Sequence, residues 1–372
     1  MIIEVGKTGT VEEAAGLLTS VCQHESVRSV LMLACDENRF TPETLDPVLR
    51  GMEVPVFGGV FPQIVYETDC LSRGCIVAGL SHEADVHVIR GLSDETADFE
   101  AILEDHPVRP DVQTLFVFVD GLSTRLSALI DGLFNIVGME HRYIGGGAGS
   151  LSFVQKPCLL TRDGMVQDGA VFAAVNAECS VGVSHGWTEI GGPFQVTESC
   201  RNVIRTLDWR PAFRVYRDVV EGHSGQFFTE QNFFDLSKRY PFGISRLDAE
   251  TVVRDPLRTD PDGSLVCVGE VPQECYVHIL TGNTNSLVQA AREAMETGTQ
   301  AFRRKPEFGT TLFIDCISRA LFLEDQFAQE LEAVHNRPMP LIGALTLGEI
   351  ANNGQTYLEF YNKTSVVGIL ED

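Results

Sequence analysis

Residues 182–186 carry the most direct catalytic signal in the sequence, because they match the G-x-S-x-G pattern of serine hydrolases. In those enzymes the serine lies on a sharp turn between a strand and a helix, which exposes its hydroxyl group. The residues before Ser184 suit a strand, but Gly191, Gly192 and Pro193 follow too closely for a helix to begin. A hydrolase that uses Ser184 is therefore kept only as an alternative function.

A glycine run at Gly145, Gly146 and Gly147 shares features with a phosphate-binding loop. The third glycine of the G-x-G-x-x-G pattern is missing, and the following residues look extended rather than helical. No helix N-terminus would then face a phosphate group. We expect either a turn that needs positive φ or a stretch of backbone that forms one wall of a ligand site.

His185 lies between small residues and close to Trp187. A histidine in apolar and aromatic surroundings could be an axial ligand of haem, which makes His185 the candidate metal ligand of the chain. The competing interpretation is an ordinary histidine held by hydrogen bonds. We expect both residues to border a ligand site.

Further candidate ligand-binding residues lie in the C-terminal part of the chain. Arg319 follows a predicted buried strand, where its guanidinium group could clamp a carboxylate or pair with a neighbour such as Asp315. Glu349, beside Gly348 in a predicted turn, could accept an ammonium or hydroxyl group, or be a solvated loop carboxylate. Asn362 could complete the pocket or only end a strand. Ligands of α/β proteins usually lie at strand ends and turns, which favours these positions.

The composition is that of a soluble globular protein, with 372 residues of which 44% are apolar and 22% charged. The formal net charge of -24 disfavours binding to nucleic acid or to an anionic membrane surface. No apolar run is long enough to span a membrane, and the first residues do not resemble a secretory signal. The ten cysteines include no C-x-x-C pair, so we expect reduced thiols and a cytoplasmic protein.

These candidate residues need a scaffold, which the sequence predicts through a pattern that occurs three times. Each copy runs strand, helix, buried strand, helix, glycine turn and strand, an order typical of α/β proteins. The first strands are predicted at 2–5, 86–89 and 276–280, the buried strands at 30–35, 115–119 and 311–316, and the glycine turns at 55–59, 143–147 and 340–344. The predicted fold class is therefore α/β with three strand–helix repeats, and the ligand pocket is expected where the glycine turns converge.

A segment of different character, residues 180–271, separates the second and third copies. It is rich in aromatic residues and in turn signals such as 191–193 and 260–263, which favours short strands in a mixed or antiparallel sheet. We expect this insertion to pack as a lid or second lobe beside a repeat core formed by residues 1–179 and 272–372.

Several motifs in the chain resemble those of the FIST family. In that family a glycine-rich turn of the N-terminal domain leads into a G-x-x-P/E-I-G, V-T and L-D-x-x-P-A series. Residues 144–148, 187–191, 194–197 and 207–212 resemble this domain, and residues 313–319, 340–344, 347–350 and 361–364 resemble the C-terminal FIST domain. The resemblance covers nearly the whole chain and implies a division into a FIST N-like region, 1–208, and a FIST C-like region, 209–372.

The resemblance implies an intracellular sensor for signal transduction, of the bacterial two-component input type, that binds a small-molecule ligand. Some members of the family are associated with haem and nitric-oxide sensing, so a haem-binding nitric-oxide sensor is an alternative, although no cofactor is required. Others have been suggested to bind amino acids. No transmitter segment is recognised, so signalling would pass through a separate protein such as a histidine kinase or a cyclic-dinucleotide enzyme. We expect no enzymatic activity and no catalytic residue.

Overall fold

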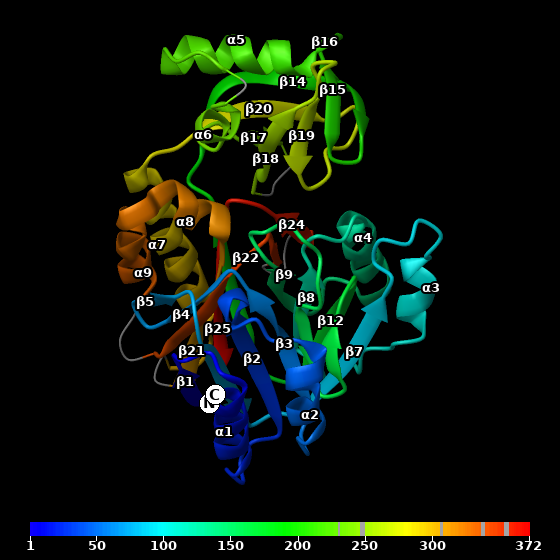
Figure 1. The fold of residues 1–372 in the computed structure, drawn as a ribbon, viewed down its shortest axis with the longest axis vertical. Helices are drawn as coiled ribbons and strands as arrows, with labels where there is room; N and C mark the ends of the chain where they lie inside the picture. Colours follow the sequence, from blue (N-terminus) through cyan, green and yellow to red (C-terminus); the bar gives the residue numbers. More distant parts are fainter. Residues whose placement is uncertain (230, 246–249, 306–307, 336–338, 353–356) are drawn as a thin grey trace.

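The computed structural model describes the chain except for residues 230, 246–249, 306–307, 336–338 and 353–356 (Figure 1). Within this described part the strands form three six-stranded sheets and one seven-stranded sheet, accompanied by helices. The predicted α/β class is confirmed in this general form. The two chain ends lie together, with the ammonium group of Met1 3.4 Å from the carboxylate of Asp372.

The first sheet has the strand order β1-β6-β2-β3-β10-β11. Strands β2 and β3 are parallel, and the other neighbouring pairs are antiparallel. The predicted buried strand 30–35 corresponds to β2, of which every residue is buried. The elements of this part of the chain are β1 (Ile2–Gly6), α1 (Val11–Cys22), β2 (Ser29–Cys35), η1 (Asp36–Asn38), α2 (Pro42–Arg50), β3 (Val56–Phe61), β4 (Gln63–Tyr66), β5 (Asp69–Leu71) and β6 (Cys75–Leu80).

The second sheet has the order β7-β12-β8-β9-β23-β24, again with one parallel pair, β8 and β9. The predicted buried strand 115–119 lies within β8, which is buried along its whole length. Its part of the chain contains β7 (Ala84–Arg90), α3 (Phe99–Glu104), β8 (Thr114–Asp120), α4 (Leu126–Val137), β9 (Arg142–Ala148), β10 (Leu159–Thr161), β11 (Gly164–Val166) and β12 (Gly169–Val175).

The third sheet has the order β13-β25-β21-β22-β4-β5, with β21 and β22 parallel. The first strand of this sheet along the chain is β13. Residues 276–280 do form a strand, but their predicted place as the first strand of the third copy is wrong, because they pair in the fourth sheet. The elements are β13 (Cys179–Ser184), α7 (Thr284–Ala301), β21 (Gly309–Cys316), α8 (Ile317–Leu323), η3 (Glu324–Gln326), α9 (Phe327–Val334), β22 (Leu341–Thr346), β23 (Glu349–Ala351), β24 (Glu359–Tyr361) and β25 (Ser365–Glu371).

These three sheets share one order of parallel and antiparallel pairings, and each is completed by a hairpin from another part of the chain. The hairpin β10–β11 extends the first sheet, β23–β24 the second, and β4–β5 the third. Every sheet therefore contains strands that are far apart in sequence, and none of the three can form from one continuous segment.

The fourth sheet builds a smaller lobe, residues 188–281, which stands apart from the other sheets at the top of Figure 1. Its order is β14-β20-β17-β18-β19-β15-β16, and an additional pairing of β14 with β15 closes six of these strands into a barrel. The predicted insertion began at residue 180 and ended at 271, so its bounds differ from those of the lobe. The elements are β14 (Thr188–Cys200), β15 (Val203–Leu207), β16 (Arg210–Pro211), α5 (Ala212–Ser224), α6 (Phe233–Ser237), β17 (Phe242–Ile244), β18 (Val252–Thr259), β19 (Leu265–Val268) and β20 (Tyr276–Thr281).

The three predicted glycine turns are wrong as turns, because their glycines lie inside strands. Gly58, Gly145 and Gly343 occupy β3, β9 and β22, each facing a residue of the parallel neighbour strand. A Cβ atom at any of the three would overlap the backbone carbonyl of that neighbour. Glycine is needed there because two buried backbones approach closely, and no open corner for a ligand results.

None of the described helices is long and apolar enough to cross a membrane.

Replacement of Gly343 by alanine should destabilise the protein by more than about 2 kcal/mol, because the added methyl group meets the Phe313 carbonyl in the buried sheet. Urea unfolding of the purified chain measures the change. The matched control is Gly16→Ala in α1, where nothing lies within 4 Å of the new methyl group. That control should gain up to about 1 kcal/mol from helix propensity. Equal stability of the two variants would contradict the close approach of the strands.

Candidate ligand-binding site

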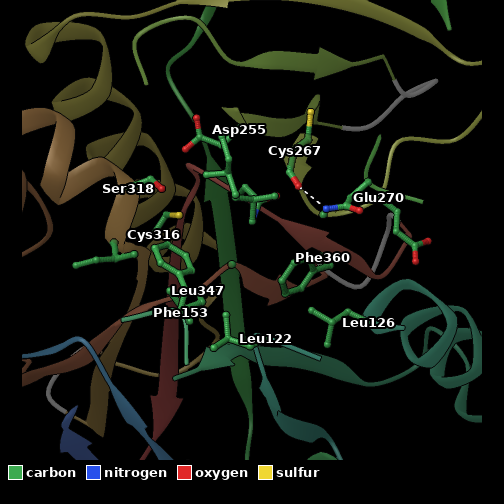
Figure 2. A pocket seen from close by; sticks show the side chains of 18 of the residues that line it. Leu122, Leu126, Phe153, Asp255, Cys267, Glu270, Cys316, Ser318, Leu347 and Phe360 are labelled. Atoms are coloured by element: carbon green, nitrogen blue, oxygen red, sulfur yellow. Dashed lines mark hydrogen bonds between the residues drawn. The ribbon is translucent and has the colours of Figure 1, made fainter. Parts of the chain in front are cut away.

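A cavity of about 300 Å³ lies where the smaller lobe meets the second and third sheets (Figure 2). The lobe contributes residues of β18 and β19, and the second sheet contributes the segment after β8 and the start of α4. The third part of the wall comes from the start of α8 and from residues beside β23 and β24. Four distant segments of the chain therefore meet around one space.

The walls of the cavity are mainly apolar. Leu122, Leu126, Leu347 and Phe360 border it together with Phe153 (Figure 2). Phe153 is 60% exposed, and its backbone has a φ of 54°, an uncommon conformation for a phenylalanine. An exposed aromatic side chain at the edge of an apolar cavity is typical of a binding site.

Two buried polar side chains, Asp255 and Asn362, also line this space. Oδ2 of Asp255 lies 3.1 Å from Nζ of Lys363, and Oδ1 of Asn362 accepts a hydrogen bond of 3.3 Å from Arg254. The other oxygen of Asp255 and the amide nitrogen of Asn362 have no hydrogen-bond partner among the described residues. Burial raises the pKa of Asp255, while Lys363 and the Ser318 hydroxyl oppose that rise.

Behind the cavity lies a buried ionic cluster centred on Arg319. Its Nε lies 2.9 Å from Oε1 of Glu330 and 3.1 Å from Oδ1 of Asp315, and all three side chains are inaccessible to solvent. Desolvation raises the pKa of Asp315, and the nearby Glu330 adds to that rise. Of the two sequence interpretations of Arg319, the structure therefore shows the ion pair with Asp315.

The remaining donors of Arg319 hold the two connections of the smaller lobe. Nη1 donates to the His185 carbonyl at 2.7 Å and to the Lys363 carbonyl at 3.2 Å, and Nη2 donates to the Leu287 carbonyl at 3.0 Å. His185 precedes β14, and Leu287 follows β20. With its nitrogens engaged in this way, Arg319 positions the lobe, and it is not among the residues that line the cavity.

Glu349 is fully buried in β23, so its interpretation as a solvated loop carboxylate is wrong. Oε1 lies 3.0 Å from the Thr346 hydroxyl, and Oε2 accepts a 3.2 Å hydrogen bond from the backbone of Thr364. Burial raises the pKa of Glu349 to about 8. The Thr346 hydroxyl also lies 3.2 Å from the Asp315 carbonyl and can donate its proton there. The Thr346 oxygen can then accept a hydrogen bond from the protonated carboxyl group of Glu349.

The predicted glycine run supports the cavity from behind. Gly145, Gly146 and Gly147 are buried in β9 and do not line the space. Side chains at the last two would overlap or crowd the backbone of Leu347 and Gly348, which do line it. The backbone of Gly147 exchanges two 2.8 Å hydrogen bonds with this segment. The run therefore places the turn that forms part of the cavity wall.

The surroundings of His185 do not fit an axial haem ligand. Nδ1 accepts a 2.8 Å hydrogen bond from the backbone of Trp187, so the ring proton is on Nε2, which lies 3.4 Å from Glu250. Neither nitrogen then has a free lone pair for iron. Desolvation, with a smaller effect of Arg319, lowers the pKa of His185 to about 4, so the ring is neutral.

Trp187 and Ser184 also have structural surroundings. The indole of Trp187 is buried and donates to the Lys363 carbonyl at 3.1 Å. Ser184 ends β13, the next element is β14, and the Ser184 hydroxyl lies 3.4 Å from the Glu293 carboxylate. A strand rather than a helix follows the serine, so the geometry of a hydrolase elbow is absent there.

Among the predicted site residues, Gly348 and Asn362 line the cavity. The others form its support or lie in the hydrophobic core beside it. Sequence reasoning missed Asp255, although a signal existed, because a charged pair at 254–255 follows the apolar residues Val252 and Val253. A charged side chain in a strand that is otherwise buried needs a partner, and this requirement marks a candidate site.

Replacement of Arg319 by leucine should cost about 3–5 kcal/mol of stability, because Asp315 and Glu330 would remain buried without their cation. Chemical unfolding provides the measurement. Arg205→Leu is the control, since Arg205 and its partner Glu198 are each about half exposed. That variant should lose far less stability, because an exposed ion pair contributes little. A similar cost for both would show that the buried cluster is not a main source of stability.

Glu349→Gln should change how stability depends on pH. The pKa of Glu349 is about 8 in the folded protein and 4.5 in a model peptide, so its stabilising contribution is complete below pH 4.5 and is lost as the pH rises to 8. Glutamine mimics the protonated side chain and does not titrate. The variant should therefore gain stability relative to the wild type over this interval, measured by urea unfolding at several pH values. The exposed Glu12→Gln should show no such trend, and parallel curves for Glu349→Gln would contradict the buried, protonated carboxyl group.

Comparison with known proteins places this geometry in a family. A family model described as the FIST N domain matches residues 29–210, and one described as the FIST C domain matches residues 212–352. No curated protein matches the chain. The two matches together cover most of the sequence, and they meet inside the smaller lobe, between β16 and α5. The chain belongs to the FIST family, whose domains are sensor domains of signal transduction.

Proposed function

We propose that this protein is a sensor that binds a small-molecule ligand in the cavity between the smaller lobe and the second and third sheets. The observation that carries the proposal is a pair of buried polar atoms beside that cavity, Oδ1 of Asp255 and Nδ2 of Asn362, which lack a hydrogen-bond partner in the part of the chain that the structure describes. Unpaired buried polar groups cost free energy, and a ligand with matching groups would recover it. Membership of the FIST family supports the same function.

The position of the cavity explains how binding could become a signal. Asp255 and Leu257 belong to the lobe, whereas Leu126 and Phe360 belong to elements of the second sheet. A ligand that touches both sides binds one arrangement of lobe and sheets better than any other. Binding therefore shifts the population toward that arrangement. The free energy of this shift is no larger than the difference between the ligand's binding free energies for the two arrangements.

A loop between β9 and β10 suits the role of a lid. The Ser150 hydroxyl donates to Asp36 at 2.7 Å and Gln155 donates to Asp120 at 2.9 Å, so both ends of the loop are fixed. Between these anchors, Leu151 and Phe153 border the cavity with large exposed areas. Closure of these side chains over a ligand would bury apolar surface and add to the affinity.

The ligand state would pass to a separate signalling protein, such as a histidine kinase or a cyclic-dinucleotide enzyme, in the cytoplasm. The structure shows no disulfide bond among the described cysteines, which suits a reducing compartment. The pairing order shared by the three six-stranded sheets supports our interpretation that they are copies of one unit. A haem-based sensor and a Ser184 hydrolase gain no support from the surroundings of His185 and Ser184.

Leu126→Trp should fill the cavity and abolish ligand binding while the fold persists, because Leu126 lies half-buried at the start of α4. The wild-type chain is screened by thermal shift against a library of small metabolites, and each stabilising compound is then titrated into the variant. The control is Leu17→Trp on α1, a half-buried leucine remote from the cavity lining. Compounds that stabilise Leu126→Trp as strongly as the control bind elsewhere, which would refute the proposed site.

A further inference from the structure

The polar groups at the cavity define what kind of ligand it can take. Asp255 and Asn362 both line the cavity, and the residue next to each in sequence contacts the other. Arg254 donates to Asn362 at 3.3 Å, and Lys363 lies 3.1 Å from Asp255. The two atoms left over are one hydrogen-bond acceptor, Oδ1 of Asp255, and one donor, Nδ2 of Asn362. A ligand that pairs with both atoms must therefore offer one donor and one acceptor.

Among the described residues, the cations nearest this cavity already have acceptors within the chain. Lys363 is shared between Asp255 and the Lys238 carbonyl, and Arg254 donates to three backbone carbonyl groups as well as to Asn362. Arg201, at the cavity wall, lies 2.6 Å from a carboxylate oxygen of Glu95. A ligand carboxylate would lose its hydration and approach the negative side chain of Asp255 without gaining an ion pair.

A cationic ligand group fits poorly because it can donate hydrogen bonds but cannot accept one. An ammonium group could approach Oδ1 of Asp255, but it carries only donors and would leave Nδ2 of Asn362 unpaired. A zwitterion such as a free amino acid would combine both costs. Nδ2 of Asn362 would give its carboxylate one hydrogen bond from an unpartnered buried donor, where water supplies several.

From these contacts we infer that the ligand is a neutral, mainly apolar molecule whose polar group both donates and accepts a hydrogen bond, as a carboxamide or an alcohol does. The inference rests on the proposed function, because it specifies the ligand class of the same cavity. The donor of the ligand faces Asp255, its acceptor faces Asn362, and its apolar part packs against walls that include Leu126, Leu257 and Phe360.

Five probes with a common phenyl group test this class, titrated into the full chain by isothermal calorimetry. Phenylacetamide and 2-phenylethanol carry the two neutral groups and distinguish a carboxamide from an alcohol. Phenylacetate, 2-phenylethylamine and phenylalanine carry the anion, the cation and the zwitterion. At least one neutral probe should bind about tenfold or more tightly than each charged probe, the effect of one unmatched hydrogen bond.

The variant Asn362→Asp tests the donor side of the pair. It keeps an oxygen for Arg254 but replaces the free amide nitrogen by a second oxygen. The neutral probes should weaken about tenfold, and 2-phenylethylamine should bind more tightly than it does to the wild type. Asn352→Asp is the matched control, because Asn352 is also buried with an unpartnered Nδ2 but does not line the cavity. It should leave every probe unchanged.

The outcomes separate the ligand class from the proposed function. One outcome is that a charged probe binds the wild type most tightly, whether phenylacetate, 2-phenylethylamine or phenylalanine, and that Leu126→Trp abolishes this binding. That result would overturn the neutral ligand class but leave the proposed sensor site intact. Binding that persists in Leu126→Trp, or no binding of any probe at millimolar concentration, would overturn the assignment of a neutral ligand to this cavity. The wild-type comparison decides the question even if Asn362→Asp fails to fold.

Discussion

The buried guanidinium group of Arg319 is the interaction on which the arrangement of this protein depends. It joins β21, α8 and α9 through Asp315 and Glu330, and its other nitrogens donate to carbonyl groups on either side of the smaller lobe. A cation without solvent exposure is stable only when anions and hydrogen-bond acceptors surround it, so these segments must all be present together. Both chain connections of the lobe are therefore held by the same buried side chain, Arg319.

This attachment determines where a cavity can exist. The side chains around Arg319 are joined by several hydrogen bonds, but Oδ2 of Asp315 and Oε2 of Glu330, like Oδ1 of Asp255 and Nδ2 of Asn362, have no partner among the described residues. Of these four residues, Asp255 and Asn362 line the cavity, where a ligand can supply the missing partner. Ligand binding and the position of the lobe are thereby linked through neighbouring residues such as Lys363, which contacts both Asp255 and Trp187.

The three six-stranded sheets can be compared position by position, because they have the same order of parallel and antiparallel pairings. Asp315 occupies the register position of Val119 in the second sheet and Ala34 in the first. Glu349 likewise occupies the register position of Ile64 and Leu159, the corresponding residues of the other two hairpins. Buried acidic side chains thus stand at positions that are apolar in the corresponding strands, in the third sheet and in the neighbouring strand β23. Charge in a core that could be apolar lowers stability, which points to a role in positioning the lobe.

The sequence by itself determined the α/β class, the buried strands and the family, because apolar runs, turn residues and motif order are local signals. It also marked Gly348 and Asn362, which do line the cavity. Tertiary structure decided the rest. The glycines expected at turns lie where parallel backbones touch, and the strand expected at 276–280 pairs in the lobe rather than in the third sheet. Asp255 and Asn362 are more than a hundred residues apart, and they line one cavity only because β24 pairs in the second sheet and the lobe lies beside it. Such contacts are long-range, so no local pattern of residue types could reveal them.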